Sequence, residues 1–446
     1  MNQDIATNNS VNKSDNNRHY LVPWKYQQSA PQPSQFVRGK GPWLFDVQNK
    51  RTFDLSSGWI AANLGHGIPE ITRAIADESQ KLSYLPPIFA NEKRSQLCRM
   101  LSDLSPWPEG ARTHLVTGGG EAMDDALKIA RMLTGRHKIM AAYRSYHGTT
   151  LGASGVTGDK RRWVNEPAAQ KSIRFFAPYP YRSPFYTESA SEEVERAIDH
   201  LELTVVQEGA SSIAAIVLEP VVGSSGLIVY PAEYLKRVRQ FADQHGILLI
   251  FDEVMTGFGR VGEAFAAVRF DVSPDMIVFG KGVNGGTLPL GGVILPEALA
   301  AMFDQDILFD AGHTHAGHPV VAASGVAALE YFQKYNLFKR AYSIETVISQ
   351  TLNTLRNELP VVGDVRGIGA FWGIELVSDK KTKSPLVGWY SADTTLSDQI
   401  TSELLKRGVW AMCRYSIIMI APPLVSTDEE IMDALEIIKS VLTNLT

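Results

Sequence analysis

The chain has 446 residues, of which 44% are hydrophobic and 20% are charged, and its net charge at pH 7 is −5. This composition is typical of a soluble globular protein, and the length suits one large domain with a smaller one. A chain without a basic field is not expected to bind nucleic acid. Its two cysteines, Cys98 and Cys413, exclude a disulfide framework and favour a cytoplasmic protein.

The first 18 residues are polar and rich in asparagine, and we expect them to form a flexible tail. They contain no apolar segment of the kind that a signal peptide needs. An apolar run of 18 residues is also missing from the rest of the sequence, so we expect no membrane-spanning helix.

The middle of the chain, residues 71–334, alternates between short apolar runs and segments with helical periodicity. Runs such as IAAIVLE and ILLIFD predict buried strands, and AMDDALKIARMLTG predicts an amphipathic helix. Buried strands that alternate with helices predict an α/β domain with a mostly parallel sheet that helices cover on both faces.

The two ends of the chain predict a smaller α+β domain made of residues 19–70 and 335–446. The N-terminal part contains GPWLFDVQNKRTFDLSSG, which has hairpin character. The C-terminal part contains VGDVRGIGAFWGIELVSD, which predicts a strand pair. It also contains LSDQITSELLKRG and TDEEIMDALEIIKSVLTNL, which predict two helices, the second with a good N-cap.

Three predicted strands each end in an ionisable residue. These residues are Glu219, Asp252 and Lys281, about 30 residues apart, which is the length of a βαβ unit. The carboxyl ends of parallel strands meet at the edge where open α/β folds bind ligands. One such charge is often structural, but three together favour a functional site.

A run of three glycines, Gly118 to Gly120, lies between a predicted strand and a predicted helix. Free backbone amides at such a helix start can bind a phosphate, although a plain tight turn would have the same sequence. A phosphate seat, a buried lysine and a carboxylate at neighbouring strand ends fit pyridoxal 5′-phosphate. The lysine can form a Schiff base with its aldehyde, and the carboxylate can keep its ring nitrogen protonated.

At these residues the sequence resembles the class III pyridoxal-phosphate aminotransferases of fold type I. The motifs that carry the resemblance are YHGTT, FDEVMTGFGRVGEAFA, PDMIVFGKGV with LPLGG, and HTHAGHP, in the order of the family. The resemblance extends from about residue 20 to the C-terminus. It implies a seven-stranded type of sheet in the large domain and a homodimer or a dimer of dimers.

The resemblance implies a role for each residue that matches a motif. Lys281 would carry the Schiff base and move the proton, and Asp252 would hold the ring nitrogen. Tyr146 and Val254 would contact opposite faces of the ring. The remaining cofactor residues would be Gly119 and Gly120 at the phosphate, Thr314 at the phosphate of the other subunit, and Glu219 near the ring, where it can meet a mobile arginine.

The sequence departs from the family pattern at four places, one in the phosphate loop and three that bear on the substrate. The phosphate loop reads GGG, where a hydroxyl residue is usual beside the glycine. Trp59 and Ile60 stand where many members have leucine and tryptophan, and His315 stands where many have an aromatic residue, so all three are predicted to line the pocket. Arg414 is the predicted carboxylate-binding arginine, although its spacing to the following Pro-Pro is about two residues short.

Two other motifs suggest different ligands. GFGRVG, residues 257–262, matches a dinucleotide-binding pattern, but such a site needs a strand that leads directly into a helix. HTHAGH supplies His313, His315 and His318 in a metal-like spacing. The resemblance explains this segment without a metal, and we predict none.

The predicted function is therefore a transaminase with a ping-pong cycle. The favoured acceptor is pyruvate, and the donor is an ω-amino acid, a taurine-like sulfonate or a simple amine. The alternatives are an aminotransferase that uses 2-oxoglutarate, an aminomutase, a decarboxylating transaminase and, more distantly, a nicotinamide dehydrogenase based on GFGRVG. A non-catalytic binding protein is the last alternative.

Overall fold

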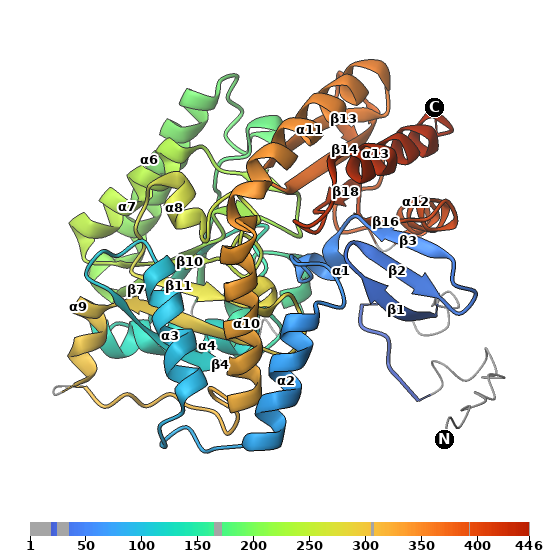
Figure 1. Ribbon diagram of the computed structural model, residues 1–446. Coiled ribbons are helices and arrows are strands. Elements are labelled where there is room, and N and C mark those ends of the chain that lie inside the picture. Colours follow the sequence, from blue (N-terminus) through green and yellow to red (C-terminus); the bar gives the residue numbers. More distant parts are fainter. Residues whose placement is uncertain (1–18, 25–34, 165–171, 305–306, 392, 446) are drawn as a thin grey trace, which may run out of the picture.

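The computed structural model describes residues 19–24, 35–164, 172–304, 307–391 and 393–445. The tail predicted for residues 1–18 lies outside these ranges. A larger α/β part surrounds one broad sheet, and a smaller part beside it contains segments from both ends of the chain (Figure 1). Among the helices of the described ranges, none is both long and apolar enough to cross a membrane.

The central sheet of the larger part has seven strands. In spatial order they are β4 (Ala111–Val116), β12 (Gly291–Pro296), β11 (Met276–Phe279), β10 (Leu248–Asp252), β7 (Ile213–Leu218), β5 (Lys138–Ala142) and β6 (Ser172–Phe175). All neighbouring pairs from β11 to β6 are parallel, whereas β12 is antiparallel to both of its neighbours. The predicted α/β class with a mostly parallel sheet is thereby confirmed.

Helices cover this sheet on both faces, which explains why its inner strands are almost entirely buried. Every residue of β7, β11 and β12 is buried. The helices of this part are α2 (Pro69–Lys81), α3 (Glu92–Leu104), α4 (Gly119–Thr134), α5 (Leu151–Val156), α6 (Ala190–Glu208), α7 (Ala232–His245), α8 (Ala266–Phe270), α9 (Glu297–Ala300) and α10 (Pro319–Lys334). Of these, α4 buries the predicted apolar stripe that includes Ala122, Ala126 and Ile129.

The smaller part contains two sheets and four helices in the described ranges. One sheet has β1 (Phe36–Lys40), β2 (Trp43–Asp46), β3 (Arg51–Asp54) and β16 (Val409–Trp410); the other has β13 (Val362–Ile368), β14 (Phe371–Asp379), β15 (Ser384–Pro385), β18 (Ile417–Ile420) and β17 (Met412–Arg414). The helices are α1 (Ser57–Ile60), α11 (Leu337–Glu358), α12 (Thr395–Lys406) and α13 (Asp428–Thr443). A two-stranded sheet of β8 (Val221–Val222) and β9 (Ile228–Val229) follows β7.

The predicted local elements of the smaller part are present. β2 pairs antiparallel with β3, β13 pairs antiparallel with β14, and Thr427 and Glu430 form a capping box at the start of α13. β16 pairs in parallel with β3, so segments from opposite ends of the sequence share one sheet (Figure 1). The domain limits at residues 70 and 335 stay a prediction.

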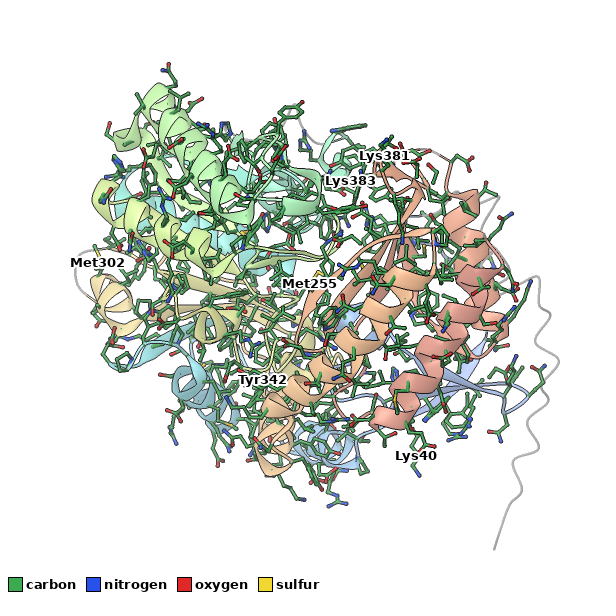
Figure 2. The ribbon with its side chains drawn as sticks, turned by 90° about the horizontal axis from the view of Figure 1, so that it is seen from above. Lys40, Met255, Met302, Tyr342, Lys381 and Lys383 are labelled. Carbon is green, nitrogen blue, oxygen red and sulfur yellow. The ribbon has the colours of Figure 1, made fainter. Side chains whose placement is uncertain are left out.

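The GFGRVG segment is a turn that packs against α11. A Cβ atom on Gly262, where φ is +98°, would lie 2.9 Å from a ring carbon of Tyr342, a residue that Figure 2 labels. The next helix, α8, begins only at Ala266. This segment therefore lacks the direct passage from strand to helix that a dinucleotide site requires.

Arg260 in this turn joins the larger and smaller parts. Its side chain is fully buried, and its Nη1 donates to the carbonyl oxygens of Ala370 and Pro422 at 3.0 and 2.7 Å. Its Nη2 donates to Ser57 Oγ at 3.1 Å and Asn63 Oδ1 at 2.7 Å. One guanidinium thus satisfies four buried acceptors from separate segments.

We expect Arg260→Leu to lower the free energy of unfolding by about 3 kcal/mol or more, because it leaves buried acceptors without a donor. Denaturant unfolding followed by circular dichroism measures the effect. Arg38→Leu is the control, since Arg38 is exposed, and it should change stability by less than about 1 kcal/mol. Equal losses in the two variants would contradict the proposed role of Arg260.

Candidate active site

The three ionisable residues predicted at strand ends do converge at the carboxyl edge of the central sheet. β7, β10 and β11 are adjacent and parallel. Glu219 follows β7 directly, Asp252 is the last residue of β10, and Lys281 lies two residues beyond β11. The carboxylates of Asp252 and Glu219 are both close enough to act on the Lys281 amine electrostatically.

Lys281 lies in a tight turn against the start of α4. Its φ of +42° places it in the left-handed region, which is strained for a residue other than glycine and is found often at functional sites. A Cβ atom on the preceding Gly280 would lie 3.4 Å from the Gly119 nitrogen. The lysine therefore follows a strand that ends beside the glycine run.

The pKa of Lys281 is lowered, chiefly because burial disfavours the ammonium ion. The carboxylates of Asp252 and Glu219 oppose this effect, and the Arg161 guanidinium adds to it. A lowered pKa increases the fraction of neutral amine, which is the nucleophilic form.

Asp252 is held in place by His147, which the sequence analysis did not identify. The Nδ1 of His147 lies 2.6 Å from Asp252 Oδ2, and the Val254 amide donates to Asp252 Oδ1 at 3.0 Å. The side chain of His147 is fully buried, and its Nε2 has no hydrogen-bond partner in the part of the chain that the structure describes. Its position directly after Tyr146 in the YHG motif is the signal that could have revealed it.

The glycine run lies at the N-terminus of α4, where backbone amides can bind an anion. Gly118 is the N-cap residue and supplies no side-chain acceptor, so the first-turn amides are available to a phosphate. A Cβ atom on Gly119 would lie 2.8 Å from Val254 Cγ2, so only glycine fits against that valine. The neighbouring hydroxyl of Thr117 donates to Glu121, which leaves the seat with backbone donors.

Glu219 anchors the backbone of Tyr146. Its Oε1 accepts from the Tyr146 amide at 2.8 Å, and its Oε2 accepts from the Gly223 amide at 2.9 Å. Burial raises the pKa of Glu219 to about 7, and the Asp252 carboxylate contributes to the rise. Glu219 therefore connects β7 to the segment that carries Tyr146.

Two arginines and one aspartate form a cluster over Tyr146 that the sequence analysis found only in part. Asp159 Oδ1 accepts from Arg161 Nε at 2.8 Å, and its Oδ2 accepts from Arg414 Nη2 at 3.3 Å. The guanidinium carbon of Arg161 lies 3.4 Å from the ring centroid of Tyr146. Arg414, the predicted carboxylate-binding arginine, thus lies beside Arg161, and its role stays a prediction. The charged run DKRRW, residues 159–163, was the available signal for Arg161.

The Asp159 carboxylate is buried, which by itself would raise its pKa. The two guanidiniums nevertheless bring the pKa of Asp159 below its ordinary value, so it stays ionised. One anion between two cations leaves the cluster with a net positive charge next to Tyr146.

The other residues with a predicted role in the site are either exposed at the surface or buried in the hydrophobic core. Trp59 is 47% exposed, and its ring centroid lies 4.6 Å from that of Trp24, whereas Ile60 is buried in the hydrophobic core. Thr314 and His315 are exposed on the loop before α10. Their roles in the substrate pocket and at a partner subunit's cofactor stay predictions.

Residues 26–442 match the class III aminotransferase family. The chain belongs to the class III aminotransferases. A probable aminotransferase of Mycobacterium tuberculosis is 35% identical over 422 residues, which cover 92% of this chain and 89% of that protein. An omega-aminotransferase of Caulobacter vibrioides is 32% identical over 424 residues, which cover 92% and 93%. These likenesses establish the recognition made from the motifs.

The solved structures that the aminotransferase resembles share its fold over nearly the whole chain. A taurine:2-oxoglutarate aminotransferase from Bifidobacterium kashiwanohense is 34% identical with a TM-score of 0.91 and covers 96% of each chain. An (S)-enantioselective omega-transaminase from Thermomicrobium roseum is 32% identical with a TM-score of 0.89 and the same coverage. The enzyme is therefore a fold type I aminotransferase.

Class III aminotransferases use pyridoxal 5′-phosphate, and the residues of this site fit that cofactor. Gly119 packs so closely against Val254 that a Cβ atom there would collide, which brings the backbone amides at the start of α4 beside the end of β10. Asp252, held by His147, is a suitable acceptor for a protonated ring nitrogen. Lys281, with its lowered pKa, is a suitable amine for the aldehyde.

We expect Lys281→Ala to abolish covalent attachment of the cofactor. Borohydride treatment followed by mass spectrometry of the denatured protein should show the cofactor on the wild-type chain and on Lys128→Ala, a control at a half-exposed ion pair on α4. It should show no attachment in Lys281→Ala. Attachment to a different lysine would remove Lys281 from its predicted role.

We expect Glu219 to make the stability of the cofactor-free protein fall as the pH rises. Because the pKa of Glu219 is about 7 in the folded chain and about 4.5 for an ordinary exposed glutamate, the folded form retains a proton that the unfolded form has lost between these values. The free energy of unfolding of Glu219→Gln should therefore rise relative to that of the wild type as the pH increases from about 4.5 to 7. This relative rise in the free energy of unfolding is at most ~3 kcal/mol over the whole range.

Thermal unfolding over this pH range measures the difference. The exposed Glu188→Gln variant is the control and should follow the wild type. A Glu219→Gln curve parallel to the wild type would contradict the raised pKa.

Proposed function

We propose that this aminotransferase takes its amino group from a donor that carries an acid group at the end opposite the amine. An ω-amino carboxylate or a taurine-like aminosulfonate has this structure. The single observation that carries the proposal is the Arg161–Asp159–Arg414 cluster against Tyr146. The acceptor is a keto acid, and the two half-reactions alternate in a ping-pong cycle.

The cluster has the charge and the position that an acid group requires. Its two guanidiniums exceed the charge of Asp159, and arginine binds carboxylates and sulfonates through its planar fork of donors. Arg161 lies against the ring of Tyr146, which the resemblance places on one face of the cofactor. The side chain of Arg414 is 24% exposed, which leaves it accessible to a substrate.

The remaining residues support proton transfer at the substrate's amine-bearing carbon. When bound, pyridoxal phosphate supplies an aldehyde for the amino group and a ring that accepts electrons. Lys281 Nζ would take the proton from that carbon and deliver it to the carbon of the former aldehyde, so that the amino group stays on the cofactor when the carbonyl product leaves. Asp252 keeps the ring nitrogen protonated, and His147 orients Asp252 through the 2.6 Å hydrogen bond.

The acceptor that the cluster favours is a dicarboxylate. The sequence favoured pyruvate, which has one carboxylate. The two guanidiniums of the cluster offer a partner for each carboxylate of 2-oxoglutarate, and one similar structure is a taurine:2-oxoglutarate aminotransferase. We therefore place 2-oxoglutarate ahead of pyruvate.

The exposed surface around Thr314 supports a homodimer, with a dimer of dimers as the larger alternative. Tyr84 Oη donates to the Thr314 carbonyl, so the segment after α2 lies beside the loop of Thr314. The same segment exposes Ile88 and Phe89, by 87% and 54%, and Leu308 nearby in sequence is 83% exposed. Exposed apolar side chains on these two segments favour a subunit interface. We propose a cytoplasmic enzyme, from the composition alone.

We expect Arg161→Leu and Arg414→Leu each to reduce kcat/KM about 30-fold for taurine, β-alanine and 2-oxoglutarate. This factor corresponds to roughly 2 kcal/mol, the loss of one charge-assisted contact. Activity with an uncharged amine donor should change much less in its own half-reaction, which single-turnover loss of the cofactor's visible absorbance measures.

Equal losses for acidic and uncharged donors would refute an acid-binding role. Pyruvate and 2-oxoglutarate each regenerate the aldehyde form of the cofactor if they are acceptors. The rates of this half-reaction with the two keto acids show which one the enzyme prefers. The Lys128→Ala enzyme serves as the control in both assays.

A further inference from the structure

A second cluster of potential ligands lies away from the cofactor site, between β4, α4 and the loop before α10. His114 Nε2 lies 2.9 Å from Asp125 Oδ2, and His313 Nε2 lies 2.8 Å from the same oxygen. The three ligand atoms all lie within 4.8 Å of one another. The aminotransferase mechanism above uses none of these side chains.

The surroundings of this cluster are apolar. Asp125 lies on the face of α4 that also carries the buried Ala122 and Ala126, and its side chain is only 9% exposed. The ring of Phe309 packs edge-on against the ring of His114, with 5.1 Å between centroids. Both histidines contact one oxygen of this carboxylate, Asp125 Oδ2, so the three side chains point toward a common centre.

We propose that His114, Asp125 and His313 bind one zinc ion. Two imidazole nitrogens and one carboxylate oxygen form a donor set that Zn²⁺ prefers, and three protein ligands leave a fourth position for water. Zinc bonds of roughly 2.0–2.1 Å in tetrahedral geometry separate ligand atoms by about 3.3 Å. The two contacts to Asp125 would therefore open by about 0.5 Å to admit the ion.

The position of His313 makes this adjustment and the entry of the ion feasible. Its side chain is 31% exposed, and it lies on a loop, so it can move without disturbing the sheet. His315 and His318 do not join the cluster; their rings lie near Tyr84 instead. The metal-like spacing of HTHAGH thus contributes one ligand, and the other two come from β4 and α4.

The proposed ion would have a structural role and would not take part in the transfer of the amino group. It would join the helix that begins with Gly119 and Gly120 to the loop that carries Thr314, the residue after His313. Zinc should therefore stabilise the loop next to the proposed subunit interface. This inference does not depend on the identity of the amine donor.

The test is zinc binding by the holoenzyme after removal of metal with a chelator. Competition with a chromophoric zinc indicator should give one equivalent per chain, and Co²⁺ should give the intense visible bands of a tetrahedral site. We expect His313→Ala and Asp125→Asn to weaken zinc binding at least about 100-fold, in line with the loss of one of three ligands. His315→Ala, two residues along the same loop, should bind zinc as the wild type does.

An anomalous difference map at the zinc edge, from crystals of the zinc-loaded holoenzyme, places the ion independently of the variants. A peak between His114, Asp125 and His313 supports the proposal. A peak elsewhere, the absence of a saturable site in the wild type, or undiminished binding by both His313→Ala and Asp125→Asn would overturn it.

Discussion

Three parallel strands that end at one edge of the sheet are the constraint on which the rest of this enzyme depends. β7, β10 and β11 are hydrogen-bonded neighbours, so Glu219, Asp252 and Lys281 must emerge close together. Each group is costly to bury alone, and each has a partner that offsets the cost. Backbone amides hold Glu219, His147 holds Asp252, and the turn after β11 presents Lys281 to both carboxylates.

Charges of both signs act on the pKa of Lys281. Burial and the Arg161 guanidinium lower the pKa of Lys281, whereas the two carboxylates raise it. The same guanidinium lies over Tyr146 and pairs with Asp159. The group that would recognise the substrate's acid end therefore also favours the neutral amine that the chemistry needs, since both effects come from one positive charge.

The smaller part of the molecule completes this site because β3 and β16 pair across the two ends of the sequence. β17, which carries Arg414, extends the C-terminal sheet toward Asp159 of the larger part. Arg260 also joins the two parts, through Pro422 and Asn63. Figure 2 shows Lys381 and Lys383 at the outer surface of the smaller part, well apart from Met255, which follows Val254 in the interior.

The features that follow from local rules could be predicted from the amino-acid sequence. Apolar runs and their spacing determined the parallel strands, and the parallel geometry required Glu219, Asp252 and Lys281 to share one edge. The glycine run after β4 determined an anion seat because a helix start leaves its amides unpaired. Tertiary structure alone decided which distant side chains meet. His147 on Asp252, Arg161 with Arg414 on Asp159, and His313 with His114 on Asp125 each join different segments, and the direction of a side chain there depends on packing that no local pattern encodes.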